Sequence, residues 1–237
     1  MRPLVVSRYA LWAPDMESPQ DWREYVRGAR KIPLSRQGPG LDFITAPAFK
    51  PLKRRLSQLS KMTLRVVRDV LPVDPRTKLT FLSFRGEVNR QYEINRMLLT
   101  EEALSPAAFS LSVFNTPAAA ASIAFGLTAG YSALYPAHDR FGAGFLAACA
   151  GVLSGAEEEA LVVYGDECCP VEYAGLCAEE PLAFAALIRG AGRGAALAPE
   201  DWSSPRRFLA RLCDGVAGGE EGKGSAGLEV AGVEPAS

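Results

Sequence analysis

The sequence predicts an α/β domain in which helices cover both faces of a β-sheet. Segments with strand character alternate with segments of helical periodicity along most of the 237 residues, which is the pattern of such domains. Two helical segments, 116–126 and 142–150, are rich in Ala, Gly and Ser, so they can approach a sheet or another helix closely. Apolar residues make up 48% and charged residues 22% of the chain, an ordinary globular composition with enough apolar surface for a sizeable core.

The first half of the chain begins with a predicted strand, "LVVSRYALWAP" at 4–14. A long Pro- and Gly-rich segment at 13–50 follows, with a short helix around 22–27. Residues 52–70 place apolar side chains three and four positions apart, which predicts one amphipathic helix. The apolar positions are Leu52, Leu56, Leu59, Met62, Val66 and Val70, and Lys53, Arg54, Lys61, Arg65 and Arg68 occupy the other faces. A buried strand, "KLTFLSF" at 78–84, and a helix at 87–100 follow.

In the second half, Ser105-Pro106 has the pattern of a helix start, and Gly126 ends the small-residue helix. The remaining predicted elements are a strand at 131–135, a helix beginning near Asp139, strands at 158–167 and 181–192, and a helix at 203–215. From Gly215 onward Gly, Glu and Ala dominate and cannot bury enough apolar surface to order the chain. We therefore expect one domain at 1–214 and a disordered tail at 215–237.

The net charge is −1, but basic and acidic residues are distributed unevenly along the chain. Residues 1–100 carry 19 Lys and Arg against 9 Asp and Glu, whereas residues 101–237 carry 7 against 18. This split predicts a basic face for an acidic partner. Stacking aromatics do not alternate with the basic residues, so nucleic-acid binding is not expected.

Targeting and redox signals favour a cytoplasmic protein. No apolar run is long and charge-free enough to span a bilayer, and Arg8 interrupts the apolar N-terminus, which disfavours a secretory signal. The cysteines form an odd set of five without framework spacing, so we expect reduced thiols: Cys149, Cys168, Cys169, Cys177 and Cys213. They also lack metal-ligand spacing and a histidine partner, so no metal site is predicted.

The segment "GAGFLA" at 142–147 matches the G-x-G-x-x-A dinucleotide fingerprint, with Asp166 or Glu167 about twenty residues later. Five residues separate its first glycine from the preceding strand, whereas a phosphate-binding turn follows the strand directly. We expect Gly142 and Gly144 to lie inside a helix and to permit close packing. Nucleotide binding remains the less favoured alternative.

His138, the only histidine, lies between the strand at 131–135 and the next helix. A strand that leads into a helix is a place where α/β enzymes mount a nucleophile. Cys149 is too far along the same predicted helix to pair with His138, and Asp139 does not face it. His138 is therefore either a structural or pocket-lining residue, or a group that assists chemistry.

Residues 105–167, "SPAAFSLSVFNTPAAAASIAFGLTAGYSALYPAHDRFGAGFLAACAGVLSGAEEEALVVYGDE", resemble the corresponding part of β-ketoacyl synthases. They are most similar to the short chain length factors of aryl polyene gene clusters. The segments "ALWAPDMESPQDW", "LKRRLSQLSKM" and "LSFRGEVNR" also resemble that group, so the likeness covers roughly residues 5–190.

The resemblance implies a thiolase-like fold, N-terminal half only, with a mixed sheet covered by helices. Active relatives carry a cysteine at the nucleophile elbow after the strand matched by 131–135, and two histidines from a second half complete their site. Here the elbow has Ala137, His138 and Asp139, without cysteine, and Phe114 stands where relatives often have histidine. We therefore expect a degenerate site with no catalytic residues. An independent acyl-transfer or decarboxylating enzyme that uses His138 is the alternative.

By the same resemblance, the chain is expected to pair with an active β-ketoacyl synthase through the strand before the elbow. The heterodimer would enclose a tunnel for an acyl chain, which an acyl carrier protein delivers on its phosphopantetheine arm. No cofactor is expected to bind this chain directly. The basic segment 52–70 is a candidate contact for the carrier protein. The candidate tunnel or interface residues are Phe114, Asn115, Thr116, Ala119, Ala120, Ser132 and Ala133.

Overall fold

The computed structural model describes residues 3–44, 49–53, 55–100, 106–137, 140–173, 180–192 and 194–215. Its elements are β1 (Leu4–Trp12), α1 (Pro19–Val26), α2 (Lys50–Lys53), α3 (Gln58–Val70), β2 (Lys78–Leu82), α4 (Val88–Thr100), α5 (Pro106–Ser110), α6 (Thr116–Phe125), β3 (Tyr131–Leu134), α7 (Phe141–Ala148), α8 (Ala150–Ser154), β4 (Glu159–Asp166), β5 (Leu182–Arg189), β6 (Ala195–Leu197) and α9 (Pro205–Gly215). Of the predicted tail at 215–237, all but Gly215 lies outside the described residues, so the tail remains a prediction.

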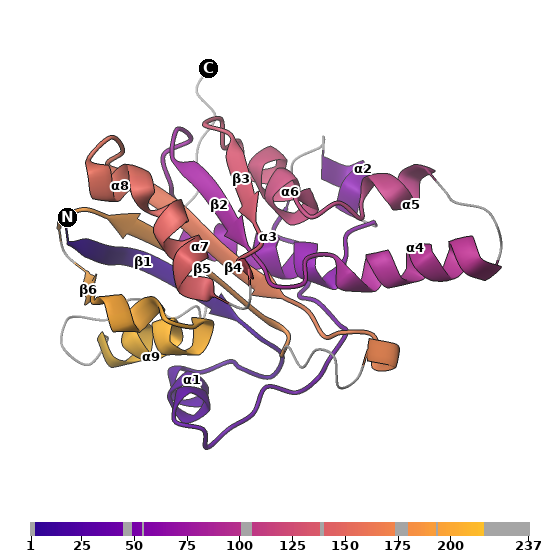
Figure 1. Ribbon diagram of the computed structural model, residues 1–237, viewed down its shortest axis with the longest axis horizontal. Coiled ribbons are helices and arrows are strands. Elements are labelled where there is room, and N and C mark those ends of the chain that lie inside the picture. Colours follow the sequence, from indigo (N-terminus) through magenta and orange to yellow (C-terminus); the bar gives the residue numbers. More distant parts are fainter. Residues whose placement is uncertain are drawn as a thin grey trace.

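The strands form one mixed six-stranded sheet in the order β3-β2-β4-β5-β1-β6 (Figure 1). The pairs β3–β2 and β2–β4 are parallel, and the pairs β4–β5, β5–β1 and β1–β6 are antiparallel. The predicted α/β class and mixed sheet are confirmed. The carboxyl ends of β2, β3 and β4 therefore meet at the same edge of the sheet, where α/β proteins commonly place their sites.

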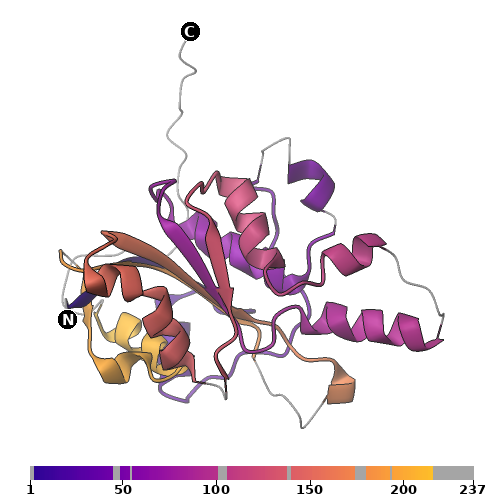
Figure 2. The same cartoon turned by 45° about the horizontal axis from the view of Figure 1, so that its top comes forward.

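Helices cover both faces of the sheet. On one face α3 and α6 pack against a core that includes Leu79, Phe81 and Val163. On the other, α1, α7, α8 and α9 pack against a second core that includes Tyr164 and Phe184. In both views α4 and α5 extend away from the sheet (Figures 1 and 2). Among the described residues no helix is long and apolar enough to cross a membrane.

Three sequence expectations need correction. The single helix predicted at 52–70 is two helices, because Ser57 caps α3 by accepting a hydrogen bond from the backbone N–H of Ser60. The helix predicted at 142–150 ends as α7 at Ala148, and α8 continues after Cys149. The strand β6, which extends the sheet beyond β1 by three residues, is not among the predicted elements.

The cysteines also differ from expectation. Cys149, Cys168 and Cys213 are free thiols, and burial raises the pKa of Cys149 to about 12. Cys169, however, is disulfide-bonded, so the prediction that every thiol is reduced is wrong for this residue. A cysteine pairing is not visible in the spacing alone, because five cysteines allow many connectivities.

Candidate functional site

The strand β3 lies at one end of the sheet and pairs only with β2 among the described residues, in the register Leu79↔Tyr131 to Leu82↔Leu134. The outer backbone groups of an edge strand are a template for pairing with another chain. Its side chains alternate between the two faces, so Ala133 contacts the core under α3 and α6 whereas Ser132 faces the α7 side. Both predicted interface residues are only half-buried.

The segment after β3 connects this edge to α7. Pro136 is buried and lies against Gly144, where an added Cβ would be 2.8 Å from the Pro136 Cγ. Ala137 is exposed. His138 and Asp139 lie outside the described residues, so their predicted place at a degenerate elbow stays a prediction.

The "GAGFLA" glycines lie inside α7, not in a turn between strand and helix. A Cβ on Gly142 would be 2.9 Å from the Trp202 carbonyl oxygen, and one on Gly144 would also approach Leu82. The close-packing interpretation is therefore supported. The dinucleotide interpretation is not, because the turn that would hold the phosphates is absent from these residues.

Phe114 and Asn115 lie beside β3. The Phe114 ring contacts Phe81 and Tyr135, each with ring centroids 6.2 Å apart, and its contact with Tyr135 is perpendicular. The Asn115 side-chain amide donates a hydrogen bond of 3.2 Å to the Tyr131 hydroxyl. Tyr131 and Tyr135 are 36% and 58% exposed. We call Phe114, Asn115, Tyr131 and Tyr135 the edge cluster.

The small residues of α6 do not share one environment. Thr116 and Ala120 are buried, and Ala120 belongs to the core cluster that α3 also lines, whereas Ala119 is half-buried. Ile123, one helical turn beyond Ala119, is 56% exposed. Of the two predicted tunnel alanines, only Ala119 lies on the open face of the helix.

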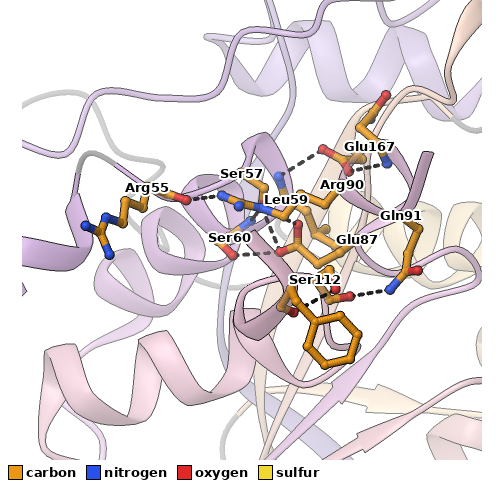
Figure 3. A network of polar contacts seen from close by, with 11 residues as sticks. Arg55, Ser57, Leu59, Ser60, Glu87, Arg90, Gln91, Ser112 and Glu167 are labelled. Carbon is orange, nitrogen blue, oxygen red and sulfur yellow. Dashed lines mark hydrogen bonds and ion pairs between the residues drawn. The ribbon is translucent and has the colours of Figure 1, made fainter. Parts of the chain in front are cut away.

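The structure also shows a buried polar network that the sequence patterns do not predict (Figure 3). Glu87 accepts hydrogen bonds from the hydroxyls of Ser57 at 2.7 Å and Ser60 at 2.9 Å, and its other oxygen lies 3.3 Å from the Arg90 Nε. Glu167 accepts hydrogen bonds from backbone N–H groups in the first turns of α3 and α4, at Leu59 and Asn89. The positive ends of two helices and one guanidinium therefore balance two buried carboxylates.

Burial raises the pKa of Glu167 from 4.5 to about 7, with the nearby charge of Glu87 as the next cause. Burial also raises the pKa of Glu87. A pocket of about 350 Å³, lined in part by Arg36, Asn89, Arg90 and Glu167, opens beside this network. Since the folded state holds the Glu167 proton more tightly than the unfolded chain does, the contribution of this proton to stability is full at low pH and is lost as the pH rises through about 7.

We therefore expect the free energy of unfolding to decrease as the pH rises from about 4.5 to about 7, because Glu167 ionises in this window. Glu167→Gln should remove much of this decrease, since an amide does not titrate. Urea unfolding across the pH range measures it, with the exposed Glu158→Gln as the matched control. An unchanged pH dependence in Glu167→Gln would contradict the assignment.

Asp166, at the carboxyl end of β4, holds the loop after β2. Its carboxylate accepts hydrogen bonds from the Ser83 hydroxyl and the Tyr164 hydroxyl, both at 2.6 Å, and from the backbone N–H groups of Phe84 and Arg85. Burial raises the pKa of Asp166 to about 6, although these donors oppose the shift. No group of three or more His, Cys, Asp or Glu side chains that could hold a metal occurs in the described part of the chain.

The predicted basic contact at 52–70 presents less free charge than the sequence suggests. Most of α3 is buried, and Arg65 and Arg68 both form ion pairs with Asp69, at 2.6 and 2.9 Å. Lys61 remains a half-buried cation on the same helix. A carrier-protein contact at α3 alone would therefore rest on few unpaired cations.

The mixed sheet with helices on both faces is the fold of a ketosynthase N-terminal domain of the thiolase-like class. Residues 22–208 match the family described as beta-ketoacyl synthase, N-terminal domain. The chain belongs to this family, as the sequence resemblance implied. A search of curated proteins finds no match.

Solved structures show the same fold. A chain in the complex of a ketosynthase (ApeO) with its chain length factor (ApeC) from Xenorhabdus doucetiae aligns with a TM-score of 0.70 and 19% identity, over 91% of this chain and 93% of that one. The ishigamide ketosynthase/chain length factor aligns with a TM-score of 0.57 and 16% identity, over 82% of this chain and 64% of that one. A type II PKS acyl-carrier protein in complex with its ketosynthase, AntDE:AntF, aligns with a TM-score of 0.57 and 14% identity, over 80% and 64%.

Proposed function

We propose that this protein is a non-catalytic chain length factor that pairs with an active β-ketoacyl synthase and shapes its acyl tunnel. The observation that carries the proposal is the outer edge of β3, which is unpaired among the described residues and is flanked by the partly exposed aromatic rings of the edge cluster. In the family that the sequence resembles, this is the strand through which subunits join. Pairing would extend the sheet into the partner and cover Tyr131 and Tyr135.

The elbow sequence supports a role without catalysis. Pro136, Ala137, His138 and Asp139 provide no thiol, and the 237 residues contain one histidine, whereas an active site of the family uses a cysteine with two histidines. We propose that His138 lines the site and that the partner supplies the nucleophile. On this proposal the chain alone forms no carbon–carbon bond from malonyl and acyl thioesters.

One aligned structure supports the chain length factor assignment. It is a complex of a ketosynthase with its chain length factor, and this chain covers 93% of the chain with which it aligns. The resemblance to aryl polyene chain length factors points to a polyene as the product class. We propose a cytoplasmic location, which three free thiols favour, although the Cys169 disulfide is unusual in that compartment.

An acyl carrier protein is the second proposed partner, since its phosphopantetheine arm would bring the growing chain to the paired subunits. One aligned structure holds a carrier protein with its ketosynthase. Reconstitution tests the whole proposal: this chain, an aryl polyene ketosynthase and a loaded carrier protein are mixed, and size-exclusion chromatography and product mass are measured. Condensation by this chain alone, or failure to form a complex, would contradict it.

Substitution of the α6 alanines tests the tunnel. Ala119→Phe places a large ring on the open face of α6 and should shorten the products while the complex still forms. Ala120→Phe is the contrasting variant, since its ring would enter the core and cost about 1–3 kcal/mol of stability by overpacking. Product mass and thermal unfolding separate the two effects. Unchanged products from a folded Ala119→Phe complex would exclude Ala119 from the tunnel wall.

A further inference from the structure

Gly86 lies against the Phe114 ring. A Cβ built on Gly86 would be 2.5 Å from the Phe114 Cδ2 and 2.9 Å from the Cε2, closer than side chains approach one another. The glycine also has φ +57°, a left-handed backbone conformation that other residues rarely adopt. Two independent features therefore require glycine here, and one of them is the position of the Phe114 ring.

The loop that carries Gly86 cannot move away from the ring. The Gly86 N–H donates to the Ser83 hydroxyl at 2.7 Å, and Ser83 in turn donates to Asp166. On the other side of Gly86, the buried Glu87 carboxylate is held by Ser57 and Ser60 (Figure 3). Any crowding at Gly86 must therefore be relieved on the Phe114 side.

Of the two rings that contact Phe114, Tyr135 is the exposed one and can move more easily. Phe81 is fully buried behind the ring, and the backbone before Phe114 is fixed by the Gln91 amide, which donates to the Ser112 carbonyl at 2.8 Å. Tyr135 is 58% exposed and lies against the ring at the end of the edge strand. A displaced Phe114 ring would move toward Tyr135, out of the core and toward the proposed acyl path.

We propose that Gly86 is a specificity-determining position, because the space above its Cα sets how far Phe114 projects toward the edge strand and hence how long a product the complex makes. The inference rests on the proposed function. An added methyl group at Gly86 would displace the ring by about 1 Å, the shift needed to restore ordinary carbon–carbon contact. Where the volume of a tunnel limits the length of the acyl chain that it holds, a ring that moves into the tunnel shortens the product.

The test is the product distribution of the reconstituted ketosynthase complex with Gly86→Ala. We expect the main product to lose at least one two-carbon unit. Gly126→Ala is the matched control, since Gly126 has a similar φ of +65° and nothing within 4 Å of its Cβ position. This control also places a side chain at a positive φ but lacks the contact to Phe114, so it should leave the product length unchanged.

The double variant Gly86→Ala/Phe114→Ala distinguishes a steric effect of the added methyl group on the Phe114 ring from a general disturbance of the fold. If Gly86 acts through the ring, the double variant should give the same products as Phe114→Ala alone. Unchanged products from a folded Gly86→Ala complex, or an equal shift with Gly126→Ala, would overturn the inference while the proposed function stands. If the unmodified chain fails to pair with a ketosynthase, the proposed function fails instead.

Discussion

Replacing Ser132 by Arg is expected to separate the protein from its ketosynthase partner. Ser132 lies in the middle of β3, half-buried, on the strand whose outer edge is unpaired in the described residues. Sheet pairing across this edge would bury the new guanidinium without a counter-ion. An unpaired buried charge costs about 3–5 kcal/mol, which corresponds to at least a 100-fold weaker complex.

The choice of Ser132 follows from the two faces of the strand. Ala133 contacts the core beneath α3 and α6, so Ala133→Arg would also disturb the fold of the chain itself. Ala196→Arg on β6 is the matched control, because Ala196 is exposed on the strand at the opposite end of the same sheet. Titration of labelled chain with ketosynthase gives the dissociation constants. Equal affinities for Ser132→Arg and Ala196→Arg would exclude the β3 edge as the interface.

The sequence predicted the architecture well because the patterns that define it are local. Apolar runs of strand length at 78–84 and 158–167, and Gly126 after a small-residue helix, each correspond to an observed element. The wrong helix prediction at 52–70 and the missing prediction of β6 also have local causes. Ser57 interrupts an apolar periodicity that otherwise continues, and β6 is only three residues long, too short to show a pattern.

The candidate site was less predictable, because it depends on which strand ends meet. The parallel neighbours of β2 are known only once the sheet order is known. The sequence did hold one signal: acidic residues lie near the carboxyl ends of two buried strands, with Glu87 after the loop that follows β2, and Asp166 and Glu167 at the end of β4. Carboxyl ends of parallel strands share an edge, so these carboxylates were candidates for one cluster. The identity of the hydrogen-bond donors could not be read from spacing.

Removal of the Asp166 carboxylate should be among the most destabilising single substitutions in this chain. The Asp166 side chain accepts hydrogen bonds from two hydroxyls and two backbone N–H groups, and the residue is 1% exposed. Asp166→Ala would remove this acceptor from the Ser83 hydroxyl and the Phe84 N–H, at about 1–3 kcal/mol for each group that water cannot reach. Some of this loss is offset, because the substitution also removes a buried negative charge.

Because the charge of Asp166 depends on pH, the loss of stability in Asp166→Ala also depends on pH. Since the folded-state pKa of Asp166 is raised to about 6, its charge opposes folding above that pH and is neutralised below it. We expect Asp166→Ala to lower the free energy of unfolding by about 3 kcal/mol at pH 7.5 and by more at pH 5, where the native protein gains stability that the variant lacks. Asp166→Asn, which keeps one acceptor oxygen, should fall between the variant and the native protein. Urea unfolding at both pH values measures this, and a loss below about 1 kcal/mol at pH 5 would show that the loop after β2 does not depend on Asp166.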